Sequence, residues 1–131
     1  MLDKNIEDVA ANLLKLAVTK LPSDIKQGLD KAMAQESNKI AKAQLSAILQ
    51  NIQLAENMNV PVCQDTGIIT FYLTVGDKFP IMSSLPTILR NATKYATEAV
   101  PLRPNAVNPF TGKNSGDNTG EHIPHINWEI V

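Results

Sequence analysis

Residues 68–75, in the middle of the chain, read Ile-Ile-Thr-Phe-Tyr-Leu-Thr-Val, and Gly-Asp follows them. β-Branched and aromatic residues fill this stretch and a turn signal closes it, so the pattern predicts a β-strand. Residues 123–131 form a second extended, apolar stretch and predict another strand. Helical patterns surround both strands, and the expected fold class is therefore α+β, with N-terminal helices packed with a small β-sheet.

Three helices are expected before the first strand, because apolar residues recur there at spacings of three and four. The first spans residues 3–21, with Asp3 as its cap, and ends before Pro22. Ser23 is expected to cap the second helix. Ser37 is expected to cap the third, which reaches to about Met58.

A fourth helix is expected from Ser84 up to Pro101, with Pro86 tolerated in its first turn. About twenty residues rich in Pro, Asn, Gly and Thr follow it as a long loop, a length typical of a functional or a disordered segment. The chain therefore divides into a helical part, about 1–58, and a mixed α/β part, about 59–131.

The composition indicates one globular domain. The chain has 131 residues, 44% hydrophobic and 19% charged, with a net charge of −1, which argues against general affinity for nucleic acid or an anionic membrane. A single cysteine excludes an intrachain disulfide and suits a reducing compartment. We find no membrane-spanning apolar run and no signal-peptide pattern, so the expected location is the cytoplasm.

The loop before the first strand carries Cys63, Gln64 and Asp65. A lone cysteine is commonly a small buried hydrophobe, but the polar residues after Cys63 argue against burial and leave a nucleophile or a metal ligand. Gln64 and Asp65 belong either to an ordinary turn or to a site that binds substrate and transfers a proton.

The long loop carries further candidates. Arg103 forms either a surface ion pair or a planar fork that grips a carboxylate through two hydrogen bonds. Glycines recur at 112, 116 and 120 without the P-loop order, which supports only a mobile or anion-cradling loop. His122 and His125 are three residues apart, but a zinc site would need at least one more ligand.

Several stretches resemble, in order, the class I iron–sulfur fumarases and the related L(+)-tartrate dehydratases. The likeness runs from about residue 5 to the end of the chain. The stretches that carry it are 61–67 (PVCQDTG), 71–76 (FYLTVG), 102–109 (LRPNAVNP) and 112–120 (GKNSGDNTG). The resemblance implies a hydro-lyase that interconverts fumarate and L-malate, a step of the tricarboxylic acid cycle, or that dehydrates L-tartrate.

The resemblance also implies a 4Fe–4S cluster held by three cysteines, with Cys63 as the first metal ligand. Gln64 and Asp65 then contact the substrate, Asp65 being the catalytic candidate, and Arg103 binds a substrate carboxylate. The sequence of residues 103–105 and 108–114 resembles fumarases more than tartrate dehydratases.

This chain departs from the family in having one cysteine instead of three. We therefore expect the N-terminal portion of the cluster-bearing domain, or of an alpha subunit, that is inactive in isolation. Its expected partners are a small dicarboxylate and the missing C-terminal part or a beta subunit, in a homo- or hetero-oligomer. Two other classes remain open: a non-catalytic binding or assembly module, and a thiol enzyme that uses Cys63 as nucleophile.

Overall fold

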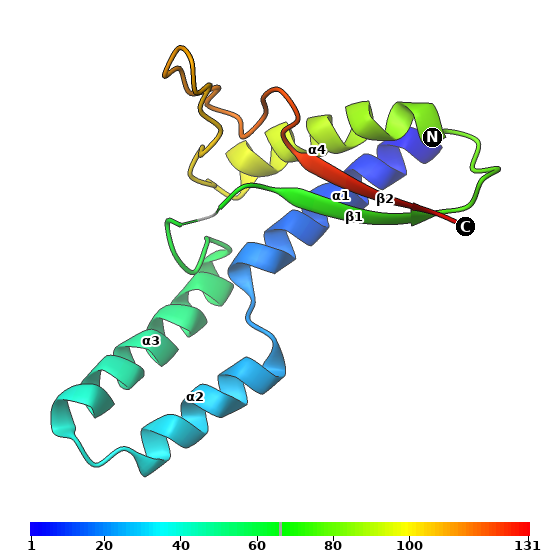
Figure 1. The fold of residues 1–131 in the computed structure, drawn as a ribbon. Coiled ribbons are helices and arrows are strands. Elements are labelled where there is room, and N and C mark those ends of the chain that lie inside the picture. The colour runs from blue at the N-terminus through cyan, green and yellow to red at the C-terminus, as the bar shows by residue number, and fades with distance from the viewer. Residues whose placement is uncertain (66) are drawn as a thin grey trace.

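The computed structural model describes residues 1–65 and 67–131 and has the expected α+β class (Figure 1). Three helices precede the first strand, and a fourth helix and a long loop separate it from the second. The elements are α1 (Leu2–Thr19), α2 (Ser23–Gln35), α3 (Lys39–Met58), β1 (Thr70–Val75), a 3₁₀ turn η1 (Met82–Ser84), α4 (Leu85–Ala99) and β2 (His125–Ile130).

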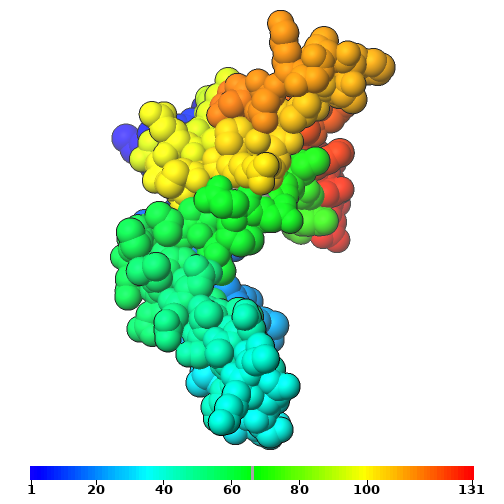
Figure 2. All heavy atoms as spheres, turned by 90° about the vertical axis from the view of Figure 1, so that its left-hand side faces the viewer, coloured from blue at the N-terminus to red at the C-terminus, as the bar shows by residue number. Residues whose placement is uncertain are grey.

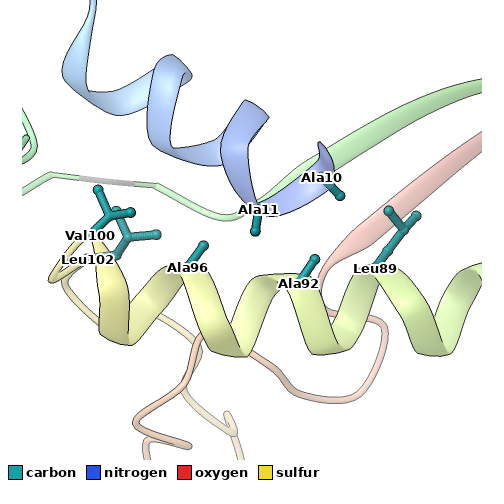
Figure 3. Close-up of a cluster of buried hydrophobic side chains, with 7 residues drawn as sticks. All are labelled: Ala10, Ala11, Leu89, Ala92, Ala96, Val100 and Leu102. Carbon is teal, nitrogen blue, oxygen red and sulfur yellow. The ribbon is translucent and has the colours of Figure 1, made fainter. Parts of the chain in front are cut away.

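The core lies between α1 and α4. Figure 3 shows alanines of the two helices facing each other, which lets the helix backbones approach closely. The larger side chains of the cluster are Leu89, within α4, and Val100 and Leu102, which follow its C-terminal end. The buried cluster consists of Ala10, Ala11, Leu89, Ala92, Ala96, Val100 and Leu102. Burying a side chain such as Leu89 contributes roughly 1.5–3 kcal/mol, so this cluster is the main support of the fold.

The sheet has two parallel strands, β1 and β2, which pair in register from Thr70 with His125 to Val75 with Ile130. Phe71 and Ile126 are neighbours in this register and pack, half-buried, against the α1–α4 core. Side chains alternate between the two faces of a strand, and Tyr72 accordingly points away from the core and is 82% exposed. The sheet therefore has one covered face and one face open to solvent.

Helices α2 and α3 form a hairpin that projects away from the rest of the molecule (Figures 1 and 2). No residue of α2 is buried, and the buried residues of α3 are Ile52 and Ala55. Large apolar side chains such as Ile40, 75% exposed, lie on the hairpin surface. The hairpin is thus supported mainly by contacts between its own two helices.

Three of the predicted helix caps were wrong. Asn38, and not Ser37, caps α3: its Oδ1 accepts hydrogen bonds from the backbone N–H of Ile40 at 2.9 Å and of Ala41 at 3.3 Å. The helix α1 begins at Leu2, which places Asp3 inside the first turn, where a negative charge favours the helix dipole.

Helix α2 begins at Ser23 itself, because Pro22 takes the extended cap position with φ −54° and ψ 146°. Ser84 does lie at the start of α4, as expected, and Pro86 lies within its first turn. Over the described residues, every helix is too short or too polar to cross a membrane.

Candidate functional site

The loop that carries Cys63 is tied to two helices just before the cysteine. It leaves α3 through Asn59, whose φ of 55° turns the chain sharply. The backbone N–H of Val62 then donates to the carbonyl of Val18 in α1 at 2.9 Å. The carbonyl of Val62 accepts from Nδ2 of Asn51 in α3 at 2.7 Å. The position of Cys63 is therefore set by the packing of α1 and α3.

Cys63, Gln64 and Asp65 all lie on the surface. The thiol of Cys63 is free and donates a weak hydrogen bond to the backbone carbonyl of Asp65, with Sγ and O 3.6 Å apart. This exposure rules out Cys63 as a buried hydrophobe. Thr66, the next residue of the motif, lies outside the described residues.

Arg103 lies in the loop that follows α4 and is also exposed. The carbonyl of Arg103 accepts a hydrogen bond from Nδ2 of Asn118 at 3.2 Å. The carbonyl of the next residue, Pro104, accepts from Nδ2 of Asn114 at 2.8 Å. Two asparagines from the far end of the loop thus hold the backbone from which the Arg103 side chain extends.

A hydrogen bond joins the two candidate loops directly. Nδ2 of Asn105 donates to the carbonyl of Gly67 at 3.2 Å, across 38 residues of sequence. Gly67 lies two residues after Asp65, and Asn105 lies two residues after Arg103. The predicted substrate-binding residues are therefore carried by adjoining loops, a proximity that their sequence spacing does not reveal.

Asn118 links this arrangement to the core. Its side chain is 4% exposed, and its Oδ1 accepts from the backbone N–H of Asn105 at 2.7 Å. Its Nδ2 also donates to the hydroxyl of Thr97 in α4 at 3.2 Å. Sequence reasoning missed both Asn105 and Asn118. The available signal was the density of asparagines in a glycine-rich loop, since Asn tolerates the left-handed φ of 57° found at Asn118.

Asp117, next to Asn118, has an electrostatic role in the same loop. Partial burial disfavours its charge, but hydrogen bonds from the hydroxyl and backbone of Thr119, the Ser115 hydroxyl and the charge of Lys94 outweigh that effect. The balance lowers the pKa of Asp117 below its ordinary value. The Thr119 hydroxyl lies 2.7 Å from the carboxylate, and Lys94 Nζ lies 3.7 Å from it. Asp117 is therefore charged at neutral pH and stabilises the loop.

The described residues do not bring together three or more His, Cys, Asp or Glu side chains as a metal site would require. Cys63 offers one thiolate for a metal. His122 lies in the turn before β2, with its Nε2 4.0 Å from a carboxylate oxygen of Glu121, and His125 begins β2. No third ligand joins the two histidines within 1–65 and 67–131, so the structure gives the zinc interpretation no support.

A cavity of about 350 Å³ lies within the long loop. Its walls include Phe110, Lys113 and His122 but none of the four predicted site residues. Cys63, Gln64, Asp65 and Arg103 are instead each exposed. Their side chains carry a thiol, an amide, a carboxylate and a guanidinium.

Comparison with known proteins gives a consistent picture. A family model described as fumarate hydratase (Fumerase) matches residues 7–131. The L(+)-tartrate dehydratase subunit alpha of Escherichia coli (strain K12) is 36% identical over 126 residues, which cover 96% of this chain and 42% of the relative. A putative L(+)-tartrate dehydratase subunit alpha of Methanocaldococcus jannaschii is 40% identical over 127 residues, covering 95% of this chain and 45% of the relative. The chain thus spans less than half the length of these relatives.

Proposed function

This chain belongs to the fumarate hydratase (Fumerase) family, and from that premise we propose that it is part of a hydro-lyase that reversibly hydrates fumarate to L-malate. One observation carries the proposal: the loop of Gln64 and Asp65 and the loop of Arg103 adjoin, joined by the 3.2 Å hydrogen bond from Asn105 to Gly67. A dicarboxylate substrate needs a fixed cation and amide donors close together. The two loops carry such groups, each of them exposed.

Each proposed site residue has a chemical role. The guanidinium of Arg103 grips one substrate carboxylate with two parallel hydrogen bonds, which a lysine could not do in the same geometry. The side-chain amide of Gln64 donates to the substrate. The carboxylate of Asp65 orients the hydroxyl group or moves a proton, because dehydration requires removal of a poorly acidic C–H proton.

The proposed cofactor is a 4Fe–4S cluster. The free, exposed thiol of Cys63 fits one thiolate ligand of such a cluster, and the two further cysteines must come from outside this chain. When bound, the cluster would supply an open-site iron that acts as a Lewis acid toward the hydroxyl group. We therefore propose that the chain is inactive alone and acts as the N-terminal portion of the cluster-bearing domain.

The proposed partner is the remaining part of the enzyme, on the same polypeptide or as a beta subunit, in a homo- or hetero-oligomer. Both relatives described above are named alpha subunits, which supports an assembly. Exposed apolar side chains support it too, because they are costly to leave in water. They include Val9 and Leu13 on α1, Ile40 and Leu54 on the hairpin, and Ile130 on β2.

L(+)-Tartrate dehydration is the second candidate, favoured by the names of the relatives. Both reactions act on a four-carbon dicarboxylate, so the same cation and amide could serve either. We nevertheless propose fumarate as the first candidate, because the sequence of residues 103–105 and 108–114 resembles fumarases more than tartrate dehydratases. A non-catalytic assembly module is a third candidate, favoured by the open sheet edge of β2.

The test is to co-produce the chain anaerobically with the remaining part of the enzyme and to measure fumarate hydration, L-tartrate dehydration and the visible absorption of the cluster. We expect fumarate turnover and cluster absorption in the assembly, with both lost in Cys63→Ser and absent from the chain alone. Turnover of L-tartrate without fumarate would favour the second candidate. An active chain without iron that is inactivated by alkylation of Cys63 would instead show a thiol enzyme.

A further inference from the structure

The side chain of Asn118 forms hydrogen bonds with backbone groups on both sides of Pro104. Its Nδ2 donates to the carbonyl of Arg103 at 3.2 Å, and its Oδ1 accepts from the N–H of Asn105 at 2.7 Å. These two backbone groups flank Pro104, which has no N–H of its own to offer. One amide side chain therefore fixes the direction of the backbone that carries Arg103.

We call these two hydrogen bonds of Asn118 the clamp. The side chain of Asn118 also bonds to a buried residue of α4. Nδ2 of Asn118 donates to the hydroxyl of Thr97 at 3.2 Å, and that hydroxyl donates to the carbonyl of Thr93 within α4 at 2.8 Å. Thr93 and Thr97 are both buried. A buried, fully bonded polar group is costly to break, so Asn118 cannot shift without disturbing α4.

The clamp also reaches the other candidate loop. Asn105, whose backbone N–H is held by Asn118, donates its own side-chain amide to the carbonyl of Gly67. A continuous series of hydrogen bonds thus runs from α4 through Asn118 and Asn105 to the loop of Asp65. This series connects that loop with the backbone of Arg103.

We propose that Asn118 is a positioning residue, which sets the place of Arg103 relative to Gln64 and Asp65 for binding of a dicarboxylate. This inference rests on the proposed function. The carboxylates of a four-carbon diacid such as fumarate lie at a nearly fixed separation, so the groups that bind them need a fixed separation too. A displacement of about 1 Å in such a site can cost on the order of 100-fold in activity.

Two substitutions distinguish the effects of the individual hydrogen bonds of Asn118. Asn118→Gly removes all three hydrogen bonds while tolerating the φ of 57°. Asn118→Asp keeps the acceptor for the N–H of Asn105 but loses the donor to the carbonyl of Arg103. The matched control is Asn108→Ala in the same loop, because within the described part of the chain Oδ1 of Asn108 accepts from the nearby N–H groups of Phe110 and Thr111, each at 3.0 Å.

The first measurement is amide hydrogen exchange in the 131-residue chain. We expect the amide of Asn105 to lose protection in Asn118→Gly and to keep it in Asn118→Asp and Asn108→Ala. The amides of Ala92 and Ala96 should stay protected in all three variants, which shows that α4 remains folded. Unchanged protection of Asn105 in Asn118→Gly would overturn the inference.

The second measurement is the KM for fumarate of the cluster-loaded holoenzyme that contains this chain. We expect both Asn118 variants to raise KM on the order of 10–100-fold with a smaller change in kcat, and Asn108→Ala to leave KM unchanged. Adding Asn118→Gly to Arg103→Met should raise KM little further, because the clamp acts through Arg103. Fully additive effects, or an unchanged KM in Asn118→Gly, would overturn the inference.

The two proposals fail in different ways. If Arg103→Met leaves KM unchanged, or if the parent holoenzyme does not act on fumarate, the proposed function fails, and the inference fails with it. If Arg103→Met raises KM but Asn118→Gly does not, the proposed function stands and the positioning role of Asn118 is wrong.

Discussion

At the scale of single residues, Asp65 combines surface exposure with a place next to the cluster-ligand candidate Cys63. The thiol of Cys63 donates to the backbone carbonyl of Asp65 and not to its carboxylate.

Replacing Asp65 with Asn should lower kcat of the holoenzyme by about 100-fold or more while changing KM little, because positioned proton transfer typically contributes 10²–10⁴-fold. Steady-state kinetics with fumarate and L-malate measure both constants. Lys113→Gln, in the long loop, is a control for an altered surface charge. Equal losses in kcat and in substrate affinity would argue that Asp65 binds substrate without moving a proton.

The lowered pKa of Asp117 predicts how acid changes the stability of the chain. Its pKa is lowered in the folded chain, so its contribution to stability is present above the unfolded-state pKa, about 3.9, and is lost as the pH falls through the folded-state pKa. Asp117→Asn should therefore be less stable than the parent at pH 7, with a difference that shrinks below about pH 4. Urea denaturation at several pH values measures it.

The control for Asp117 is Glu121→Gln, since the side chain of Glu121 is 89% exposed and lies 4.0 Å from His122. Its stability should follow that of the parent at every pH. A difference for Asp117→Asn that is constant from pH 7 to pH 3 would show that the hydrogen bonds of Asp117 do not depend on its charge.

At the scale of elements, the start of α3 shows how one of two possible N-cap residues is selected. Ser37 and Asn38 are adjacent, and both are good N-cap residues by type. The extended backbone of Asn38, φ −74° and ψ 120°, places its side chain over the first turn of α3. Asn38 is the cap because the connection between α2 and α3 ends at that residue. The N-cap preferences of Ser and Asn do not specify where the connection ends.

Asn38→Ala should lower the free energy of unfolding of the hairpin by about 0.5–2 kcal/mol, because two N–H groups lose their acceptor. Ser37→Ala, the matched control, should change it by less than about 0.5 kcal/mol. Hydrogen exchange at the amides of Ile40 and Ala41 measures the local effect. A larger cost for Ser37→Ala would restore Ser37 as the cap.

At the scale of the whole molecule, the C-terminal half of β2 is poorly covered even on the face of the sheet that packs against the core. Trp128 pairs with Leu73 in register and shares its face, yet it is 40% exposed, and Ile130 is 62% exposed. A two-stranded sheet with an open edge is marginal in water and favours addition of another strand. This edge suits contact with the remaining part of the enzyme.

Trp128 is the only tryptophan, so its fluorescence reports on that contact. We expect a blue shift of emission when the remaining part of the enzyme assembles with the chain, because Trp128 leaves water. Ile130→Lys should weaken assembly by about 10-fold or more, since it places a charge in the contact. Tyr72→Lys, on the opposite face, is the control and should assemble normally. Equal weakening by both variants would place the contact elsewhere.

The sequence by itself determined the α+β class, the approximate ranges of the helices and strands, and the candidate residues Cys63, Gln64, Asp65 and Arg103. These follow from short-range patterns, since apolar periodicity and turn residues act within a few positions. The family followed from the same motifs, and the match over residues 7–131 confirmed it. The roles of the four candidate residues stay predictions.

Only the tertiary structure decided that β1 and β2 pair in parallel, that the motif loop rests on α1 and α3, and that Asn105 bonds to Gly67. It also showed that Asn118 holds the backbone of Arg103. These contacts join residues far apart in sequence, and they form because packing of α1 on α4 brings the two loops together. A local pattern carries no information about such distances, so the candidate residues were predictable and their arrangement was not.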